Sequence, residues 1–340
     1  MYYKIIFLTL FLLIINLLLK KLNFLIDDPK ESHHKLEKKS GTPLSGGFFL
    51  FFSISSFYFI DPNFVFNSTI IFCLFLFLVL GIFSDIKENF SPKLRIIFQL
   101  FIIFLLVFLN SDILVFRTNI NFLDFLLSYD QFKFAFTIFC IITLLNGFNF
   151  MDGVNGLVSG YLLIVIITLA FILQEGNIEY YLNDFILISL IFFIFNISGK
   201  SFFGDNGIYI LSIIVSLIII KVTNNNDNIS PILAVSLLWY PAIENLFTII
   251  RRLNKGKHSY LPDKLHLHSL LYRKLNLNLK NIHFVFKNSL TGLIINIFLL
   301  PNFVFAYFFH DKSLYLGIVI SLYVILYLVI YFLLSKTSNN

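Results

Sequence analysis

The sequence predicts an all-α membrane protein that crosses the bilayer about eleven times. Of its 340 residues, 58% are hydrophobic and 13% are charged, with a mean hydropathy of +0.86. A water-soluble domain could not cover so much apolar surface. The apolar residues also fall in runs of about 15 to 20, the length with which a helix crosses about 30 Å of hydrocarbon. We therefore expect residues 1–340 to form a single integral membrane domain.

The apolar runs follow one another along the whole chain and define the expected helices. They lie at 2–19, 45–60, 66–83, 95–112, 125–145, 157–173, 185–197, 208–222, 231–250, 284–303 and 314–334. Two runs, 45–60 and 185–197, are short, and polar residues interrupt the chain from Arg117 to Asn121, so the count is open by one or two. The first run precedes Lys20-Lys21 without a small-residue cleavage site, which favours a retained span over a secretory signal.

The basic residues predict the orientation of these spans. If the Lys20–Leu44 loop lies in the cytoplasm, alternation of the spans places 20 of the 25 Lys and Arg residues on the cytoplasmic side. Such an excess follows the positive-inside rule and predicts an external N-terminus and a cytoplasmic C-terminus. Basic loops beside anionic lipid headgroups explain the net charge of +6, so we expect a bilayer environment and no nucleic-acid partner.

Polar and glycine-rich segments gather on the predicted cytoplasmic side. They lie at 27–47, 81–95, 146–157, 199–207 and 251–273. Asp85, Asp152 and Asp205 each stand at the end of a predicted span, where a carboxylate beside hydrocarbon needs a metal, another cation or a hydrated cavity. Any one of them alone is equally explained as the polar end of a helix. Together with His266 and His268 they predict a site.

The residue types in these segments favour a divalent cation and a phosphate. Carboxylate oxygens with few Cys or His suit Mg²⁺ better than Zn²⁺, and Mn²⁺ is the alternative. Glycine backbones in 147–156 and 199–207 can approach a phosphate closely and present N–H groups to it. No Walker A spacing is present, so a P-loop is not predicted. Helices that begin after 152–153 and 204–205 would direct their positive ends to the same cavity.

Three longer motifs stand within these segments. Residues 146–157 read N-G-F-N-F-M-D-G-V-N-G-L, residues 202–207 read F-F-G-D-N-G, and residues 262–268 read P-D-K-L-H-L-H. In this order they resemble segments of the polyprenyl-phosphate N-acetylhexosamine-1-phosphate transferases, of glycosyltransferase family 4 type, to which phospho-N-acetylmuramoyl-pentapeptide transferase is related. The resemblance covers about residues 27–275.

The resemblance implies an enzyme of the bacterial inner (cytoplasmic) membrane that begins the synthesis of a cell-surface glycan such as O-antigen. In this family a polyprenyl phosphate, typically undecaprenyl phosphate, attacks the β-phosphate of a UDP-N-acetyl sugar and releases UMP. Mg²⁺ would neutralise the diphosphate charge. The sequence does not identify the sugar. A homodimer is compatible with the family, but no residue decides it.

The resemblance also implies roles for individual residues. Asp205 would bind the metal. The implied catalytic residues are Asp85, Asp152, His266 and His268. The implied substrate-binding residues are Asn146, Asn149, Asn155, Asn196, Phe202 and Lys35. Phe202 would stack on uracil, and the two histidines would donate to diphosphate oxygens. For Lys35 the plainer interpretation is a lysine among lipid headgroups, and Glu244 is a second-rank candidate near a span end.

The chain departs from the family at two positions. Ser84 precedes Asp85 where the family often has a second Asp, which is a proposed base in some mechanisms. A polyprenyl phosphate is already largely ionised near neutral pH, because the second pKa of a phosphate monoester is about 6, so a base is not essential. Ser269 replaces the third His of the family loop, which favours a hexosamine-type transferase over the peptidoglycan enzyme.

Two alternatives to an active transferase remain. A transporter would carry polar groups near the middle of its spans and an internal repeat, and neither is evident in the sequence. A catalytically inactive relative of the transferases is the second alternative, and Ser84 is its best argument.

Overall fold

The computed structural model describes residues 2–27, 41–61, 64–87, 90–173, 177–254 and 265–337. Its helices are α1 (Tyr2–Leu22), α2 (Gly46–Ile60), α3 (Ser68–Ile86), α4 (Pro92–Leu109), α5 (Asn121–Leu127), α6 (Asp130–Met151), α7 (Leu157–Ile172), α8 (Asn177–Ile197), α9 (Gly204–Asn225), α10 (Ile232–Asn254), α11 (Leu267–Asn278), α12 (Phe284–Phe308) and α13 (Ser313–Thr337). Each predicted apolar run coincides with one of these helices, and α5 and α11 are additional.

The lengths of the helices support a polytopic membrane protein. Among the described residues, eight helices are long and apolar enough to cross a bilayer. Three further apolar helices are shorter, at Gly46–Ile60, Leu157–Ile172 and Tyr181–Ile197. They correspond to three of the eleven predicted spans. The structure therefore supports a polytopic membrane protein, and the number of crossings stays a prediction. The side of the membrane on which each end lies stays a prediction.

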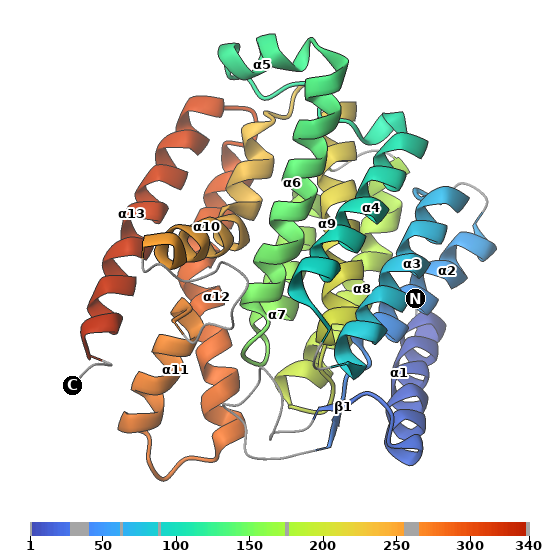
Figure 1. Cartoon of the computed structure of the whole chain (residues 1–340), viewed down its shortest axis with the longest axis vertical. Helices are drawn as coiled ribbons and strands as arrows, with labels where there is room; N and C mark the ends of the chain where they lie inside the picture. The colour runs from blue at the N-terminus through green and yellow to red at the C-terminus, as the bar shows by residue number, and fades with distance from the viewer. Residues whose placement is uncertain are drawn as a thin grey trace.

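Helix α9 lies inside the bundle (Figure 1). Of its most apolar 18-residue window, 89% is buried, against 28% for α1 and 17% for α13. It packs against α2, α3 and α6, while α1 and α13 lie at opposite edges of the view in Figure 1. The exposed Leu, Ile and Phe side chains of α1 and α13 are therefore the surface expected to face lipid.

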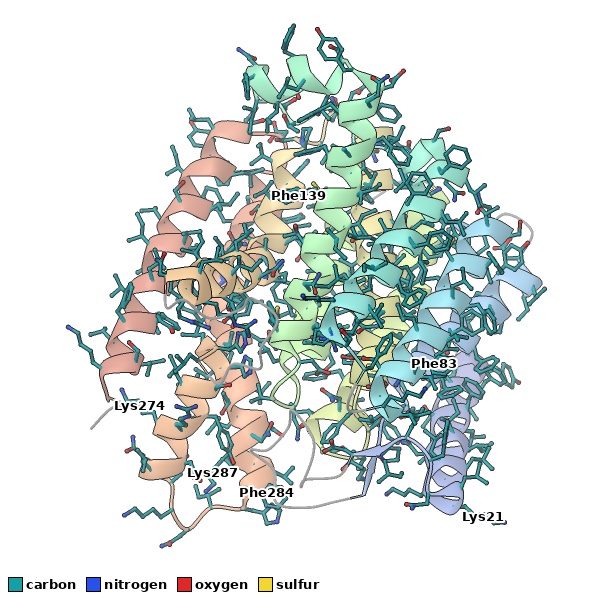
Figure 2. The ribbon with its side chains drawn as sticks, in the orientation of Figure 1. Lys21, Phe83, Phe139, Lys274, Phe284 and Lys287 are labelled. Atoms are coloured by element: carbon teal, nitrogen blue, oxygen red, sulfur yellow. The ribbon has the colours of Figure 1, made fainter. Side chains whose placement is uncertain are left out.

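One end of the bundle holds β1 and α11, and we call it the basic end (lower in Figure 1). Lys21, Lys274 and Lys287 lie there, as Figure 2 shows. Strand β1 (Ile26–Asp27) pairs antiparallel with β2 (Thr42–Pro43) at this end. Leu44 then forms a parallel bridge with Phe202. These short pairings attach the N-terminal segment to the chain just before α9.

Helix α10 changes direction within the bundle because it contains Pro241, which cannot donate the usual helical hydrogen bond. Figure 1 shows its second half running across the neighbouring helices. Helix α6 approaches α10 closely at Gly147, where a Cβ atom would lie 2.2 Å from the Pro241 carbonyl oxygen. The close approach brings the second half of α10 beside the end of α6 that precedes Asp152.

Candidate active site

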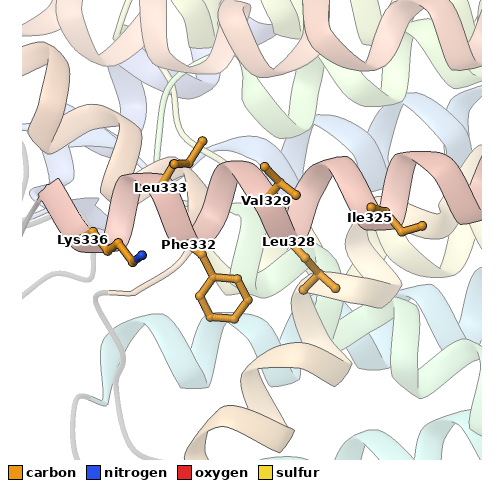
Figure 3. A pocket seen from close by; sticks show the side chains of 6 residues that line it. All are labelled: Ile325, Leu328, Val329, Phe332, Leu333 and Lys336. Atoms are coloured by element: carbon orange, nitrogen blue, oxygen red, sulfur yellow. The ribbon is translucent and has the colours of Figure 1, made fainter.

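A shallow hollow of about 330 Å³ on α13 is not the site of chemistry. It is lined by one helix only, with a single charged side chain at its end, and its lining residues are Ile325, Leu328, Val329, Phe332, Leu333 and Lys336 (Figure 3). No carboxylate or imidazole lines it, so it lacks groups for phosphate or metal chemistry. The polar groups converge instead at the first turn of α9.

Asp205 stands in that first turn and receives donors from several helices. Its Oδ1 accepts a hydrogen bond from Asn149 Nδ2 of α6 at 2.6 Å. Its Oδ2 accepts from Ser84 Oγ of α3 at 2.5 Å and from Tyr209 of α9 at 3.2 Å. Arg95 Nη1 of α4 forms an ion pair with the same oxygen at 3.0 Å. The second motif thus meets the first motif and the Ser84 segment in space.

Asp85 holds the start of α9. Its Oδ1 accepts the backbone N–H of Asp205 at 2.8 Å, and its Oδ2 accepts the backbone N–H of Asn206 at 3.0 Å. The first N–H groups of a helix lack partners within the helix and carry partial positive charge, which a carboxylate satisfies. Gly204 has a φ of +65°, and a Cβ atom there would lie 2.9 Å from Asp85 Oδ2. These contacts make Asp85 a positioning residue for Asp205, and its catalytic role stays a prediction.

Asp152 follows the last residue of α6 and is half-buried. Its carboxylate accepts no hydrogen bond from the part of the chain that the structure describes. Burial raises the pKa of Asp152 well above its ordinary value, and the negative charges of Asp205, Asp85 and Asp27 raise the pKa further. A carboxylate in this position is favoured in its ionised form only when a cation comes close.

Asp205 and Asp152 fit Mg²⁺ if a phosphate-bearing substrate supplies the remaining ligands. No group of three or more His, Cys, Asp or Glu side chains among the described residues is arranged to hold a metal ion. Mg²⁺ does not require such a cage, because it is commonly bound by one or two carboxylates with phosphate oxygens and waters. Asp205 and Asp152 would supply the carboxylates, and a phosphate-bearing substrate would complete the shell. The metal role of Asp205 stays a prediction.

The histidine motif reaches the same region. His266 immediately precedes α11, and the parallel rings of His266 and His268 lie 5.5 Å apart between centroids. A Cβ atom at Gly153 would lie 2.2 Å from His268 Nε2, so His268 lies against the loop that begins with Asp152. Both histidines are buried. The third motif therefore joins the first two, and the contact with diphosphate stays a prediction.

Glu244 of α10 fixes the orientation of His266. Its Oε2 lies 3.1 Å from His266 Nδ1, and its Oε1 accepts the Leu267 N–H at 3.2 Å and the Tyr240 hydroxyl at 3.4 Å. A carboxylate accepts hydrogen bonds only, so His266 Nδ1 carries the proton in this pair. Glu244 is fully buried, and an acidic residue inside a predicted span was the signal in the sequence.

Several predicted substrate-binding residues are buried or already hydrogen-bonded within the protein. Asn155, Asn196 and Phe202 are 2–4% exposed, and Asn146 donates to the Ile142 carbonyl oxygen within its own helix. Their roles at the substrate stay predictions, and stacking on Phe202 requires its ring to be uncovered. Lys35 lies outside the described residues. Of the predicted substrate-binding residues, Asn149 contacts Asp205 directly.

The sequence alone did not single out two residues that the structure brings to Asp205. Arg95 was visible only as a basic residue at the start of an apolar run, a position that is costly without a partner. Tyr209 was visible only as a polar aromatic side chain four residues after Asp205, on the same helix face. Neither signal names the partner, which follows from the packing of α4 against the start of α9.

The fold and the site define a polytopic membrane protein with a carboxylate and imidazole site at one end of its helices. Residues 68–223 match the model of the family "Glycosyl transferase family 4". The match covers a little under half of the chain and supports the family that its motifs resemble. The matched segment contains Asp85, Asp152 and Asp205, whereas Glu244 and the histidines lie beyond it.

Similar proteins come from several bacteria. The undecaprenyl-phosphate alpha-N-acetylglucosaminyl 1-phosphate transferases of Yersinia pestis and of Escherichia coli strain K12 are each 28% identical over 151 residues, which is 42% of this chain and 41% of theirs. A probable undecaprenyl-phosphate N-acetylglucosaminyl 1-phosphate transferase of Bacillus subtilis is 27% identical over 143 residues, or 41% of this chain and 40% of its own. The alignments thus span about two fifths of these relatives.

Proposed function

We propose that this protein transfers an N-acetylhexosamine-1-phosphate from a UDP-sugar to a polyprenyl phosphate and releases UMP. The observation that carries the proposal is the convergence of three motifs, distant in sequence, on Asp205, Asp152 and the two histidines. The family match covers the first two motifs, and relatives over this segment are named as transferases that use undecaprenyl phosphate. The product would begin a cell-surface glycan on the cytoplasmic face of the inner membrane.

The reaction needs positioned charge more than a general base. An oxygen of the polyprenyl phosphate attacks the β-phosphorus of the UDP-sugar, the bond from that phosphorus to the bridging oxygen breaks, and UMP leaves with the bridging oxygen. The attacking phosphate is already largely ionised near neutral pH, because its second pKa is about 6. This accounts for Ser84, whose hydroxyl donates to Asp205 and is not needed to remove a proton.

The surrounding side chains supply the charge that this reaction requires. When bound, Mg²⁺ would neutralise the diphosphate, as is usual in phosphoryl transfer. Asp205 and Asp152 would hold it, and the Arg95 guanidinium beside Asp205 would bring a second positive charge to the phosphates. His266 donates its Nδ1–H to Glu244, and in its doubly protonated form it would also donate Nε2–H to a diphosphate oxygen.

A reconstituted assay tests the proposal. The purified protein in detergent is given a panel of UDP-N-acetyl sugars with Mg²⁺, and UMP release is measured with and without undecaprenyl phosphate. We expect release that requires both the metal and the lipid, and the best donor identifies the sugar. If no donor yields UMP and none binds, the transferase function is wrong and an inactive relative or a transporter takes its place.

A further inference from the structure

Helix α12 presents a row of three residues to the loop that carries the first motif. Asn288, Gly292 and Asn296 are spaced by four residues and so share one face of the helix. The two asparagine side chains are 1% and 5% exposed. Buried amides in an apolar bundle are costly unless they find hydrogen-bond partners, so the location of their partners is informative.

The partners of these asparagines are backbone groups of the motif loop. Asn288 Oδ1 accepts the backbone N–H of Asn155 at 2.5 Å. Asn296 Nδ2 donates to the backbone oxygen of Gly156 at 2.8 Å and to that of Leu157 at 3.3 Å. Because these bonds reach backbone groups, they fix the path of the chain itself.

Gly292 allows α12 to approach this loop without a side chain between them. A Cβ atom on Gly292 would lie 2.3 Å from the Asn155 carbonyl oxygen and 2.8 Å from the Leu157 nitrogen. On the other side of the contact, a Cβ atom on Gly160 of α7 would lie 2.4 Å from Asn296 Nδ2. All three distances are shorter than real Cβ contacts allow, so a larger residue at Gly292 would displace the loop and one at Gly160 would displace the Asn296 side chain.

A third asparagine completes the support of the loop from α8. Asn196 Oδ1 accepts the N–H of Gly156 and the hydroxyl of Ser159, each at 2.8 Å. Gly156 itself has a φ of +76°, a conformation that a residue with a side chain rarely adopts. The backbone of residues 155–157 is thus held from two helices at once, three residues after Asp152.

We propose that Asn288 and Asn296 are positioning residues that set the place of Asp152 and thereby the binding of the UDP-sugar with its metal. The role rests on the proposed function, in which Asp152 faces the donor. Helix α12 lies beyond the segment 68–223 that matches the family model. Helix α12 therefore contributes to the donor site through the backbone of the first motif, without touching the substrate.

The test compares Asn288→Ala with Asn302→Ala. Asn302 lies on the same helix, is fully buried, and donates to the Ser236 carbonyl oxygen of α10 at 2.8 Å. Each variant loses a buried amide and its hydrogen bond, but only Asn288 holds the motif loop. We expect Asn288→Ala to raise the KM for the UDP-sugar about tenfold, the factor that one buried hydrogen bond supports, with the KM for polyprenyl phosphate unchanged. Asn302→Ala leaves the donor KM unchanged.

A second pair of variants removes no hydrogen-bonding side chain. Gly292→Ala places a methyl group against the loop, whereas a Cβ atom on Gly317 of α13 would meet nothing within 4 Å. We expect Gly292→Ala to raise the donor KM as Asn288→Ala does, and Gly317→Ala to match the wild type. If Asn288→Ala does not fold, Asn296→Ala replaces it in the comparison with Asn302→Ala.

Hydrogen exchange provides a readout that does not depend on turnover. In the wild-type protein and in Asn302→Ala, the amides of Asn155 and Gly156 should exchange slowly, and in Asn288→Ala they should exchange faster. Equal exchange in the two variants, or equal donor KM values, overturns the positioning role. A wild-type protein that releases no UMP contradicts the proposed function instead, and the exchange comparison still decides whether α12 holds the loop.

Discussion

At the scale of single residues, Asp205 is the point where the helices of the site meet. Its two oxygens accept from Asn149, Ser84 and Tyr209 and pair with Arg95. These donors fix both oxygens in place before any substrate arrives. Such preorganisation is what an electrostatic site for phosphoryl transfer requires.

Asp205→Asn should lower kcat by at least about 100-fold, since the loss of a ligand or its support commonly costs a metal site that much or more. The measurement is Mg²⁺-dependent UMP release at saturating substrates. Asp184→Asn is the matched control, because Asp184 of α8 also forms an ion pair, with Lys4 of α1 at 2.7 Å. Unchanged turnover in Asp205→Asn would remove Asp205 from the metal role.

The raised pKa of Asp152 makes a prediction about stability and pH. A carboxyl group whose pKa is raised on folding binds its proton more tightly in the folded state, so its favourable contribution is complete below its unfolded pKa of about 4. That contribution is lost as the pH rises through the folded value. In metal-free protein, Asp152→Asn should therefore have a higher Tm than wild type at pH 8 and the same Tm near pH 4.

The control for Asp152→Asn is the addition of Mg²⁺ and UDP-sugar at pH 8. A bound cation favours the ionised carboxylate, so ligand should raise the Tm of the wild-type protein more than that of the variant. A difference in Tm that is the same at pH 4 and pH 8 would contradict the assignment of the shift to Asp152.

At the scale of elements, the kinked helix α10 connects two motifs that the sequence leaves apart. Pro241 turns the helix, and Glu244, less than one turn later, contacts His266 and the first residue of α11, Leu267. The connection places the histidine motif against the loop after α6. The effect of Glu244 on His266 can be distinguished from a purely structural effect of Glu244, because the carboxylate and the imidazole contact each other and can be changed singly and together.

Glu244→Gln should reduce kcat/KM by about 10- to 100-fold, the usual cost of losing a residue that orients a functional imidazole. The amide of Gln can donate to Nδ1 and so no longer fixes the protonated nitrogen. If Glu244 acts through His266, the double variant Glu244→Gln with His266→Ala should be no worse than His266→Ala alone. Additive losses would assign Glu244 to the structure only.

The elements differ in how well the sequence predicts them. Hydropathy located the helices that face lipid or the bundle interior, because each is a long apolar run. It did not indicate α5 and α11, since both are short and mix apolar with polar residues, as in the segments 121–127 and 267–278. The motifs predicted that Asp205, Asp152 and the histidines belong to one site. The contacts of Arg95 and Asn288 depend on packing between distant helices, which no local pattern encodes.

At the scale of the whole molecule, the helices give the two ends of the bundle different character. The basic end carries Lys21, Lys274 and Lys287 (Figure 2), and the carboxylates of the site stand at the same end of α3, α6 and α9. The opposite end carries α5 (Figure 1). The positive-inside rule then predicts that substrates reach the site from the cytoplasm.

Cysteine labelling in intact cells tests this orientation. Ser128, just after α5, and Asn278, at the end of α11, are both exposed. We expect Ser128→Cys to react with a membrane-impermeant thiol reagent in intact cells, and Asn278→Cys to react only after permeabilisation. The native Cys73 is buried and Cys140 is half-buried within helices, so the unmodified protein provides the background. The reverse pattern would invert the topology.

Because other helices surround α9, we expect the geometry of the site to depend little on the thickness and lipid composition of the bilayer. A change in membrane thickness or lipid composition acts first on helices such as α1 and α13, which expose most of their surface. Asp205 stands at the first turn of a helix that other helices surround, so such changes reach it through the side chains of α3, α4 and α6 that contact it. We therefore expect the proposed transferase to keep the same donor preference in thin and thick bilayers, so that a change in the lipids of the cell would leave its choice of sugar unchanged.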